Sequence, residues 1–121
     1  MAVVIAQHTP LPEPGNVHGF AVAWGPLAVG DTGQPIDLLS NADRTLQVEG
    51  TFGAAGALQL EGSNDGVNYR VLHDPQGNKL ILSQAQITHL TEIPAFMRPN
   101  VTGGDGTTSL TLTMFVRKTQ R

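Results

Sequence analysis

The chain has 121 residues, a length that suits one domain better than two. Only 14% of the residues are charged and 40% are apolar, which excludes the intrinsically disordered class and disfavours a helical bundle rich in Glu, Lys and Leu. With 14 glycines and 8 prolines, the composition predicts a compact, turn-rich β protein.

The formal net charge of −3 is unevenly distributed along the chain. Every acidic residue lies at or before Asp105, whereas residues 117–121 contain Arg117, Lys118 and Arg121. A nucleic-acid-binding module usually carries a basic face with interleaved aromatic residues. A short basic tail on an acidic body therefore predicts no nucleic-acid partner. The tail itself is either a solvated C-terminus or a binding element.

The chain contains no cysteine, so it has neither a disulfide framework nor thiol chemistry, as suits folding in a reducing cytoplasm. No stretch approaches the roughly 18 apolar residues of a membrane span. The first residues lack the basic segment that opens a signal peptide. We therefore expect no membrane partner.

The sequence of residues 1–16 predicts an extended, proline-rich N-terminal arm. Three alternate prolines fix φ, remove backbone donors and push the preceding residues into extended conformations. A stiff arm loses less conformational entropy than a glycine-rich one when it lies on a partner. The expected contact residues of the arm are Val3, Val4, Ile5, Pro10, Leu11, Pro12 and Pro14.

Residues 17–117 alternate apolar and polar side chains in short runs, the pattern of half-buried strands. The clearest run is residues 109–117, and turn clusters rich in Gly, Asn and Asp separate the runs at intervals of about 8–12 residues. About seven or eight short strands with almost no helix predict an all-β fold, an antiparallel, jelly-roll-like β-sandwich. Residues 118–121 then form a short basic C-terminal tail.

Three segments are expected to depart from this regular pattern. Gly25–Pro26 should end the first strand of the sandwich, and residues 83–90 are the only stretch with a plausible helical turn. Pro94 and Pro99 should confine residues 93–101 to a sheet edge or an irregular stretch.

No motif predicts a catalytic, cofactor or metal site. The Gly62–Gly66 segment does not fit a nucleophile elbow, because its serine is the second residue and not the third, and the four histidines lack the spacing of zinc ligands. The loops at Asp65 and Asp105 each offer one carboxylate, whereas calcium takes about six to eight oxygens. We therefore predict a protein that is not an enzyme and has no cofactor, metal or small-molecule substrate.

Phe115 is in phase with the threonines of its run, on the face opposite the predicted core. Together with the proline-flanked pair Phe96–Met97, it forms either an apolar contact patch or a second packing layer. Phe96, Met97 and Phe115 are therefore further candidate partner-binding residues.

Residues 47–53 and 58–69 resemble small β-sandwich virion proteins of tailed bacteriophages. Residues 93–99, 103–106 and 110–117 strengthen the likeness, which covers roughly residues 45–117. The most similar group is the head decoration, or cement, proteins, which have a jelly-roll-like fold.

The resemblance implies a virion structural protein, made in the bacterial host cytoplasm, that binds the capsid exterior. Its partner would be the major capsid protein, whose subunits it bridges, and it would self-associate as a dimer or trimer. A tail or baseplate component is one alternative, because similar hairpins occur there. Another is a carbohydrate-binding module with a groove around Trp24 and Tyr69.

Overall fold

The computed structural model describes residues 2–10, 19–37 and 43–117. This part of the chain contains strands and no helix, which confirms the predicted all-β fold. The strands are β1 (Val3–Val4), β2 (Gln7–Pro10), β3 (Gly19–Leu27), β4 (Thr32–Gly33), β5 (Asp43–Thr51), β6 (Ala57–Ser63), β7 (Arg70–Val71), β8 (Ile81–Leu82), β9 (Gln86–Leu90), β10 (Phe96–Gly103) and β11 (Ser109–Arg117). Four of the eleven strands have only two residues, so seven longer strands build most of the fold.

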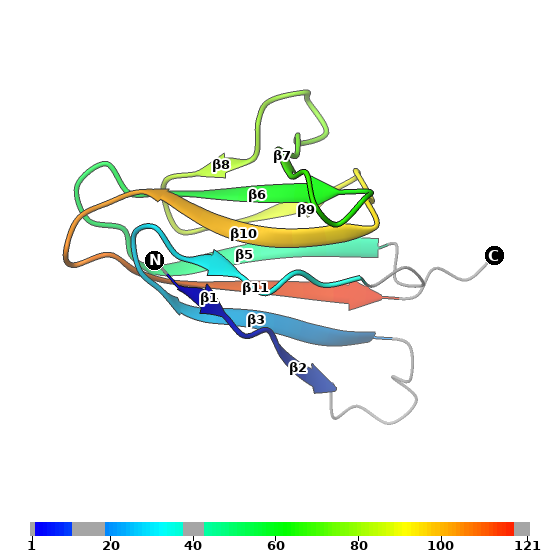
Figure 1. Ribbon diagram of the computed structural model, residues 1–121, viewed down its shortest axis with the longest axis horizontal. Coiled ribbons are helices and arrows are strands. Elements are labelled where there is room, and N and C mark those ends of the chain that lie inside the picture. The colour runs from blue at the N-terminus through cyan, green and yellow to red at the C-terminus, as the bar shows by residue number, and fades with distance from the viewer. Residues whose placement is uncertain (1, 11–18, 38–42, 118–121) are drawn as a thin grey trace.

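The strands form two sheets that lie face to face as a β-sandwich (Figure 1). Sheet A has the order β1-β4-β10-β6-β7, with β8 also paired to β6, and sheet B has the order β2-β3-β11-β5-β9. The pairing of β1 with β4 is parallel, and the other strand pairs are antiparallel. Because the chain passes repeatedly from one sheet to the other, the connections cross between the layers as in a jelly roll.

The core lies between the sheets and is built by the alternation seen in the sequence. Leu110, Leu112, Met114 and Val116 of β11 all face inward and are fully buried. Trp24 lies opposite Leu112 on the neighbouring strand β3 and is also fully buried, and its indole Nε1 donates to the carbonyl oxygen of Gln34 at 2.9 Å. The buried indole donor is therefore satisfied.

Two of the three segments expected to depart from the strand pattern lie within strands. Residues 86–90 form β9 and not a helical turn. Each of these residues pairs with a residue of β5, and this pairing outweighs a weak local preference for helix. Gly25–Pro26 lies inside β3, not at its end. A bulge between Leu110 and Leu112 gives β3 one extra residue there, and the Gly25–Pro26 peptide bond is cis.

The prolines of residues 93–101 do not place that segment at a sheet edge, because β10 lies between β4 and β6. Met97 exchanges two backbone hydrogen bonds with Ile36, and Val101 N donates to the carbonyl of Asp31. Pro99 lies between these two sites and has no N–H to donate, so the ladder between β10 and β4 shrinks to Asn100 opposite Thr32. A central strand tolerates this proline because β4 is only two residues long.

Residues 2–10, the described part of the N-terminal segment, are extended and pair with both sheets. Strand β1 pairs with β4 in sheet A, and β2 pairs with β3 in sheet B. Ala6, between the two strands, is buried and donates its N–H to Gln34 Oε1 at 3.0 Å. Residues 2–10 therefore run along one side of the sandwich from the edge of sheet A to the edge of sheet B (Figure 1), where pairing satisfies their backbone groups.

Candidate functional site

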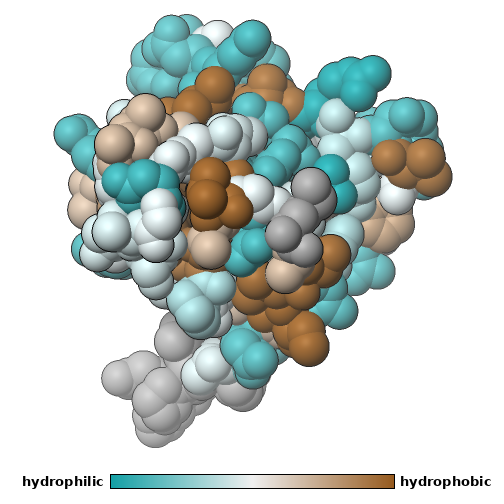
Figure 2. Space-filling model, turned by 60° about the vertical axis from the view of Figure 1, so that its left-hand side comes forward, coloured by the Kyte–Doolittle hydropathy of each residue, from teal (hydrophilic) through white to brown (hydrophobic). Residues whose placement is uncertain are grey.

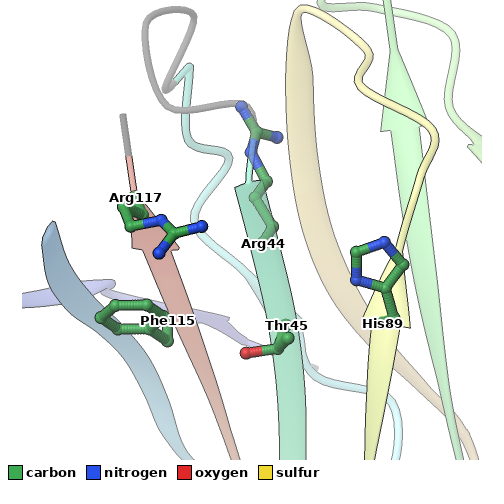
Figure 3. Close-up of a pocket in the computed structure, with 5 residues that line it drawn as sticks. All are labelled: Arg44, Thr45, His89, Phe115 and Arg117. Carbon is green, nitrogen blue, oxygen red and sulfur yellow. The ribbon is translucent and has the colours of Figure 1, made fainter. Parts of the chain in front are cut away.

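A pocket of about 320 Å³ lies on the outer face of sheet B (Figure 3). It is lined by Arg44, Thr45, His89, Phe115 and Arg117. Strand register brings these residues together, since Phe115 lies opposite Thr45 and Thr45 lies opposite His89. Directly opposed side chains on one sheet face are neighbours at about 5 Å, so the three form a row across β11, β5 and β9.

Of the two arginines at this pocket, only Arg117 is on the outer face, because Arg44 lies opposite Val116 and Leu90 and shares their buried face of the sheet. The lining residues that the structure describes include two arginines and a histidine and no Asp or Glu, and the backbone of Asp43 lies opposite Arg117 in the register of β5 with β11. Arg117 is exposed at the end of β11, and Figure 3 shows its side chain extending toward β5. Arg44 is buried, contacts Met97 Sδ through a guanidinium nitrogen, and burial lowers its pKa from the ordinary value. An arginine stays charged despite such a shift.

Two polar groups of the pocket are available to a ligand. Within the described part of the chain, neither the Thr45 hydroxyl nor the His89 ring takes part in a hydrogen bond or ion pair. Thr45 is half-buried, and Figure 3 shows its hydroxyl pointing toward the side of Phe115. On its outer face the pocket thus combines the Arg117 guanidinium, a hydroxyl and an imidazole with the half-buried ring of Phe115.

A second pocket, of about 260 Å³, lies at the end of β6 and is lined by Gly62, Ser63, Asn64, Asn68, Arg70, Leu72 and Pro94. Several of its polar groups are already engaged within the protein. The Asp65 carboxylate accepts hydrogen bonds from Ser63 Oγ at 2.8 Å and from Asn68 N at 2.8 Å, and Asn64 Oδ1 accepts one from Ala95 N at 3.0 Å. These donors to Asp65, the Asn68 amide first, hold its pKa well below the usual range. This region is a braced turn, which makes it the weaker candidate site.

The candidate residues of the N-terminal arm lie partly on the surface. Val3 and Ile5 are 66% and 65% exposed, whereas Val4 is half-buried and packs against the core. Figure 2, which turns this side of the molecule forward, shows apolar surface on it. Pro10 is the last residue of β2 and lies opposite Phe20. The remaining candidates, Leu11, Pro12 and Pro14, lie outside the described residues.

Phe96, Met97 and Phe115 do not form one apolar patch. Met97 is fully buried in the core, so its assignment to a contact surface was wrong. Phe96 is half-buried on the other face of β10, since neighbouring residues of a strand face opposite ways. Phe115 lies on the outer face of sheet B, where the sequence pattern placed it, and belongs to the pocket on that face.

Among the described residues, no group of three or more His, Asp or Glu side chains is arranged to hold a metal ion. The same residues include no helix long and apolar enough to cross a membrane.

No family model matches the chain, and no curated protein matches it. The solved structure of Peruvianin-I, a cysteine peptidase from Thevetia peruviana latex, is similar to it, with 15% identity and a TM-score of 0.51. The match covers 93% of this chain and 60% of the other, so this chain spans less than two thirds of that protein. KdgF from Halomonas sp. gives 18% identity and a TM-score of 0.39, with 94% and 76% of the two chains covered. The likeness to Peruvianin-I shows the fold alone.

Proposed function

We propose that this protein is a non-enzymatic structural component of a phage virion that binds the outside of the capsid and stabilises contacts between major capsid protein subunits. The observation that supports this proposal most directly is the N-terminal side of the sandwich. There, Val3 and Ile5 are exposed beside a sheet edge. The sequence resemblance to decoration proteins supplies the identity of the partner.

The N-terminal strands offer both backbone and side-chain contacts to a partner. Strands β1 and β2 are the terminal strands of sheets A and B, so each has one backbone edge directed away from its own sheet. A terminal strand accepts an extended segment of another protein by continuing the ladder. Val3 and Ile5 lie two residues apart in extended chain and add apolar area to the same contact.

This surface is held in place before any partner binds. Asp31 accepts the N–H of Ala2 through Oδ1 at 3.0 Å, and Gln34 accepts the N–H of Ala6. A pre-ordered contact segment loses less conformational entropy on binding than a free arm does. Residues 2–10, here called the N-terminal strap, are therefore fixed to the sandwich instead of forming the expected stiff arm.

The test is co-sedimentation of the purified protein with undecorated capsids, using point substitutions. Deletion of the N-terminal segment is unsuitable, because it would uncover the core around Ala6. Ile5→Asp introduces a charge into the proposed contact and should weaken capsid binding at least tenfold, since apolar area is lost and a carboxylate is desolvated.

Ile87→Asp is the matched control, because Ile5 and Ile87 are 65% and 68% exposed and Ile87 lies on β9, at the other edge of sheet B. It should leave binding unchanged. Full-strength binding by the Ile5→Asp variant would refute the N-terminal contact. Failure of the unmodified protein to sediment with capsids would refute the capsid function.

Two alternatives make different predictions. A tail or baseplate component would assemble into rings instead of binding an icosahedral shell. A carbohydrate module would need a groove elsewhere than at Trp24 and Tyr69, because Trp24 is fully buried and Arg98 covers the Tyr69 ring at 3.9 Å from its centroid. Peruvianin-I is a cysteine peptidase, but this chain contains no cysteine, so it cannot use a thiol nucleophile.

A further inference from the structure

We infer that the partner contact on the N-terminal side is made by strand addition, in which an extended segment of the partner joins sheet A as a new strand beside β1. This inference takes the surface of the proposed function and rests on that proposal for the identity of the partner. It goes further by naming the backbone groups that bind and the kind of segment that they accept.

The hydrogen bonds of the N-terminal strap show which of its backbone groups are already used. The carbonyl oxygen of Ala2 accepts the N–H of Thr32 at 2.9 Å, and that of Val4 accepts the N–H of Gln34 at 2.7 Å. The N–H of Ala6 donates to Gln34 Oε1 at 3.0 Å. Three alternate residues of the strap therefore direct their bonds toward β4 and the residue that follows it.

Val3 and Ile5 lie between these residues, so their backbone groups point away from β4. In an extended strand the N–H and C=O of one residue point to the same side, and those of the next residue point to the opposite side. Outside the β1–β4 ladder, no described residue forms a hydrogen bond with the backbone of Val3 or Ile5. Their N–H and C=O groups therefore form a row at the open edge of sheet A, which is the arrangement that a further strand requires.

The side chains of the same two residues are apolar and accessible. Val4 packs against the core, whereas Val3 and Ile5, on either side of it, are each about two-thirds exposed, at 66% and 65%. Neighbouring side chains on one sheet face stabilise a strand pair best when they are β-branched or aromatic. The segment that joins β1 should therefore carry apolar, β-branched or aromatic residues at every second position.

The other terminal strands are less suited to such a segment. Strand β2 ends at Pro10, which has no N–H to donate, and β7 consists of the charged Arg70 and the half-buried Val71. Strand β9 is longer, but its exposed side chains are Ile87 and His89, so it offers only one exposed apolar side chain. Only β1 and the residue after it combine outward backbone groups with two exposed apolar side chains among the described sheet edges.

The first test is amide hydrogen exchange of the protein bound to undecorated capsids. Exchange at the amides of Val3 and Ile5 should slow about tenfold or more on binding, because each amide gains an acceptor from the added strand. The amide of Ala6, which already donates to Gln34, should change much less. Equal exchange at Val3 and Ile5 in the free and the bound protein would overturn the inference.

Val3→Pro separates the backbone contact from the side-chain contact. Proline keeps an apolar side chain but has no N–H, and an edge strand tolerates it where the lost donor points outward. The variant should bind capsids about tenfold or more weakly. Val3→Thr is the matched control, because it keeps the N–H and nearly the same shape, and it should change binding by about twofold or less. Unchanged amide exchange of Ala6 in the free Val3→Pro protein shows that the strap stays in place.

Comparison of Val3→Pro with Ile5→Asp separates failure of this inference from failure of the proposed function. If Ile5→Asp loses capsids and Val3→Pro keeps them at full strength, the N-terminal side binds through side chains alone. The capsid function then stands and strand addition is refuted.

If the unmodified protein does not bind capsids, a peptide probe still tests the edge. The probe is the blocked heptapeptide Lys-Val-Thr-Val-Thr-Val-Lys, titrated to millimolar concentration into isotope-labelled protein and followed by nuclear magnetic resonance. Saturable shifts of the Val3 and Ile5 amides that the Val3→Pro variant loses would support strand addition with a partner other than a capsid. Absence of these shifts would refute strand addition together with the capsid function.

Discussion

Arg98 lies over the ring of Tyr69, with its guanidinium carbon 3.9 Å from the ring centroid, and donates through Nε to Glu61 at 3.0 Å. The Glu61 carboxylate is almost fully buried on the outer face of sheet A and also accepts hydrogen bonds from Gln59 and Asn100. A buried carboxylate is tolerable only when charged and polar donors surround it. On this face of the sandwich, the side chains of Gln59, Arg98 and Asn100 therefore all bind the Glu61 carboxylate.

Arg98→Met should destabilise the protein by about 2 kcal/mol, because the substitution leaves the buried Glu61 carboxylate without its cationic partner. The free energy of unfolding in urea measures this effect. Arg70→Met is the control, since Arg70 is exposed and its guanidinium bonds only to the carbonyl of Tyr69 among the described residues. That change should stay within about 0.5 kcal/mol. Equal losses in both variants would contradict the importance of the Glu61 network.

Gly33→Ala should destabilise the protein by about 1–3 kcal/mol through overpacking. A Cβ at this position would lie 2.5 Å from Pro99 Cδ and 2.6 Å from Trp24 Cδ1, closer than carbon atoms can pack. Gly106→Ala is the matched control, because a Cβ there meets nothing within 4 Å, and it should be neutral or slightly stabilising. Thermal unfolding of both variants checks the prediction, which fails if Gly33→Ala unfolds at the temperature of the unmodified protein.

The layers and the core could be predicted from the sequence because they depend on local alternation. In β11 the side chains from Leu110 to Val116 alternate between core and surface as the pattern required. Strand β10 was misplaced because the effect of Pro99 depends on its neighbours. The two-residue strand β4 forms few hydrogen bonds with β10 near Pro99, and Gly33 leaves room for the proline ring. Neither property is visible in the segment itself.

The pocket on the outer face of sheet B could be predicted only in part. Phe115 was identified because its phase opposes the core, a local property of one strand. Thr45 and His89 join it through the registers of β11 with β5 and of β5 with β9, which link distant parts of the sequence. Because the sequence predicts a helical turn at residues 83–90, it does not predict that His89 lies on this sheet. The N-terminal strands were missed for a similar reason, since their partners Thr32 and Ala23 are set by tertiary pairing.

Gln34→Ala should loosen the N-terminal strap without unfolding the sandwich. The side-chain Oε1 of Gln34 accepts the N–H of Ala6 at 3.0 Å, so the substitution removes one partly buried hydrogen bond, worth about 1 kcal/mol. Amide hydrogen exchange of Ala6 should accelerate about fivefold, whereas amides of β11 should be nearly unaffected. Gln47→Ala is the control, because Gln47 is exposed and bonds only to the Glu49 side chain in the described structure. Unchanged exchange at Ala6 would show that backbone pairing alone holds the segment.

Asp105 should make the stability of the protein depend on pH in the acid range. Its carboxylate joins two loops, accepting the Ala54 N–H through Oδ2 at 2.8 Å and the Thr107 N–H through Oδ1 at 2.9 Å. These bonds, that from Ala54 first, lower the pKa of Asp105 to about 2. An aspartate in an unfolded chain has a pKa of about 3.9, so the folded protein binds the proton less readily than the unfolded one does. The stabilisation is therefore present above about pH 4 and is lost as the pH falls toward 2.

Asp105→Asn tests this dependence, because an amide cannot titrate and offers one acceptor oxygen where the carboxylate offers two. We expect the variant to be less stable than the unmodified protein at pH 7, and the difference to shrink between pH 4 and pH 2. Asp65 contributes a similar acid dependence, since hydrogen bonds from Asn68 and Val67 also lower its pKa, so the variant should keep part of the slope. Urea unfolding at pH 2, 3, 4 and 7 measures both curves. A constant difference in unfolding free energy across this range would mean that Asp105 titrates alike in the folded and unfolded chains.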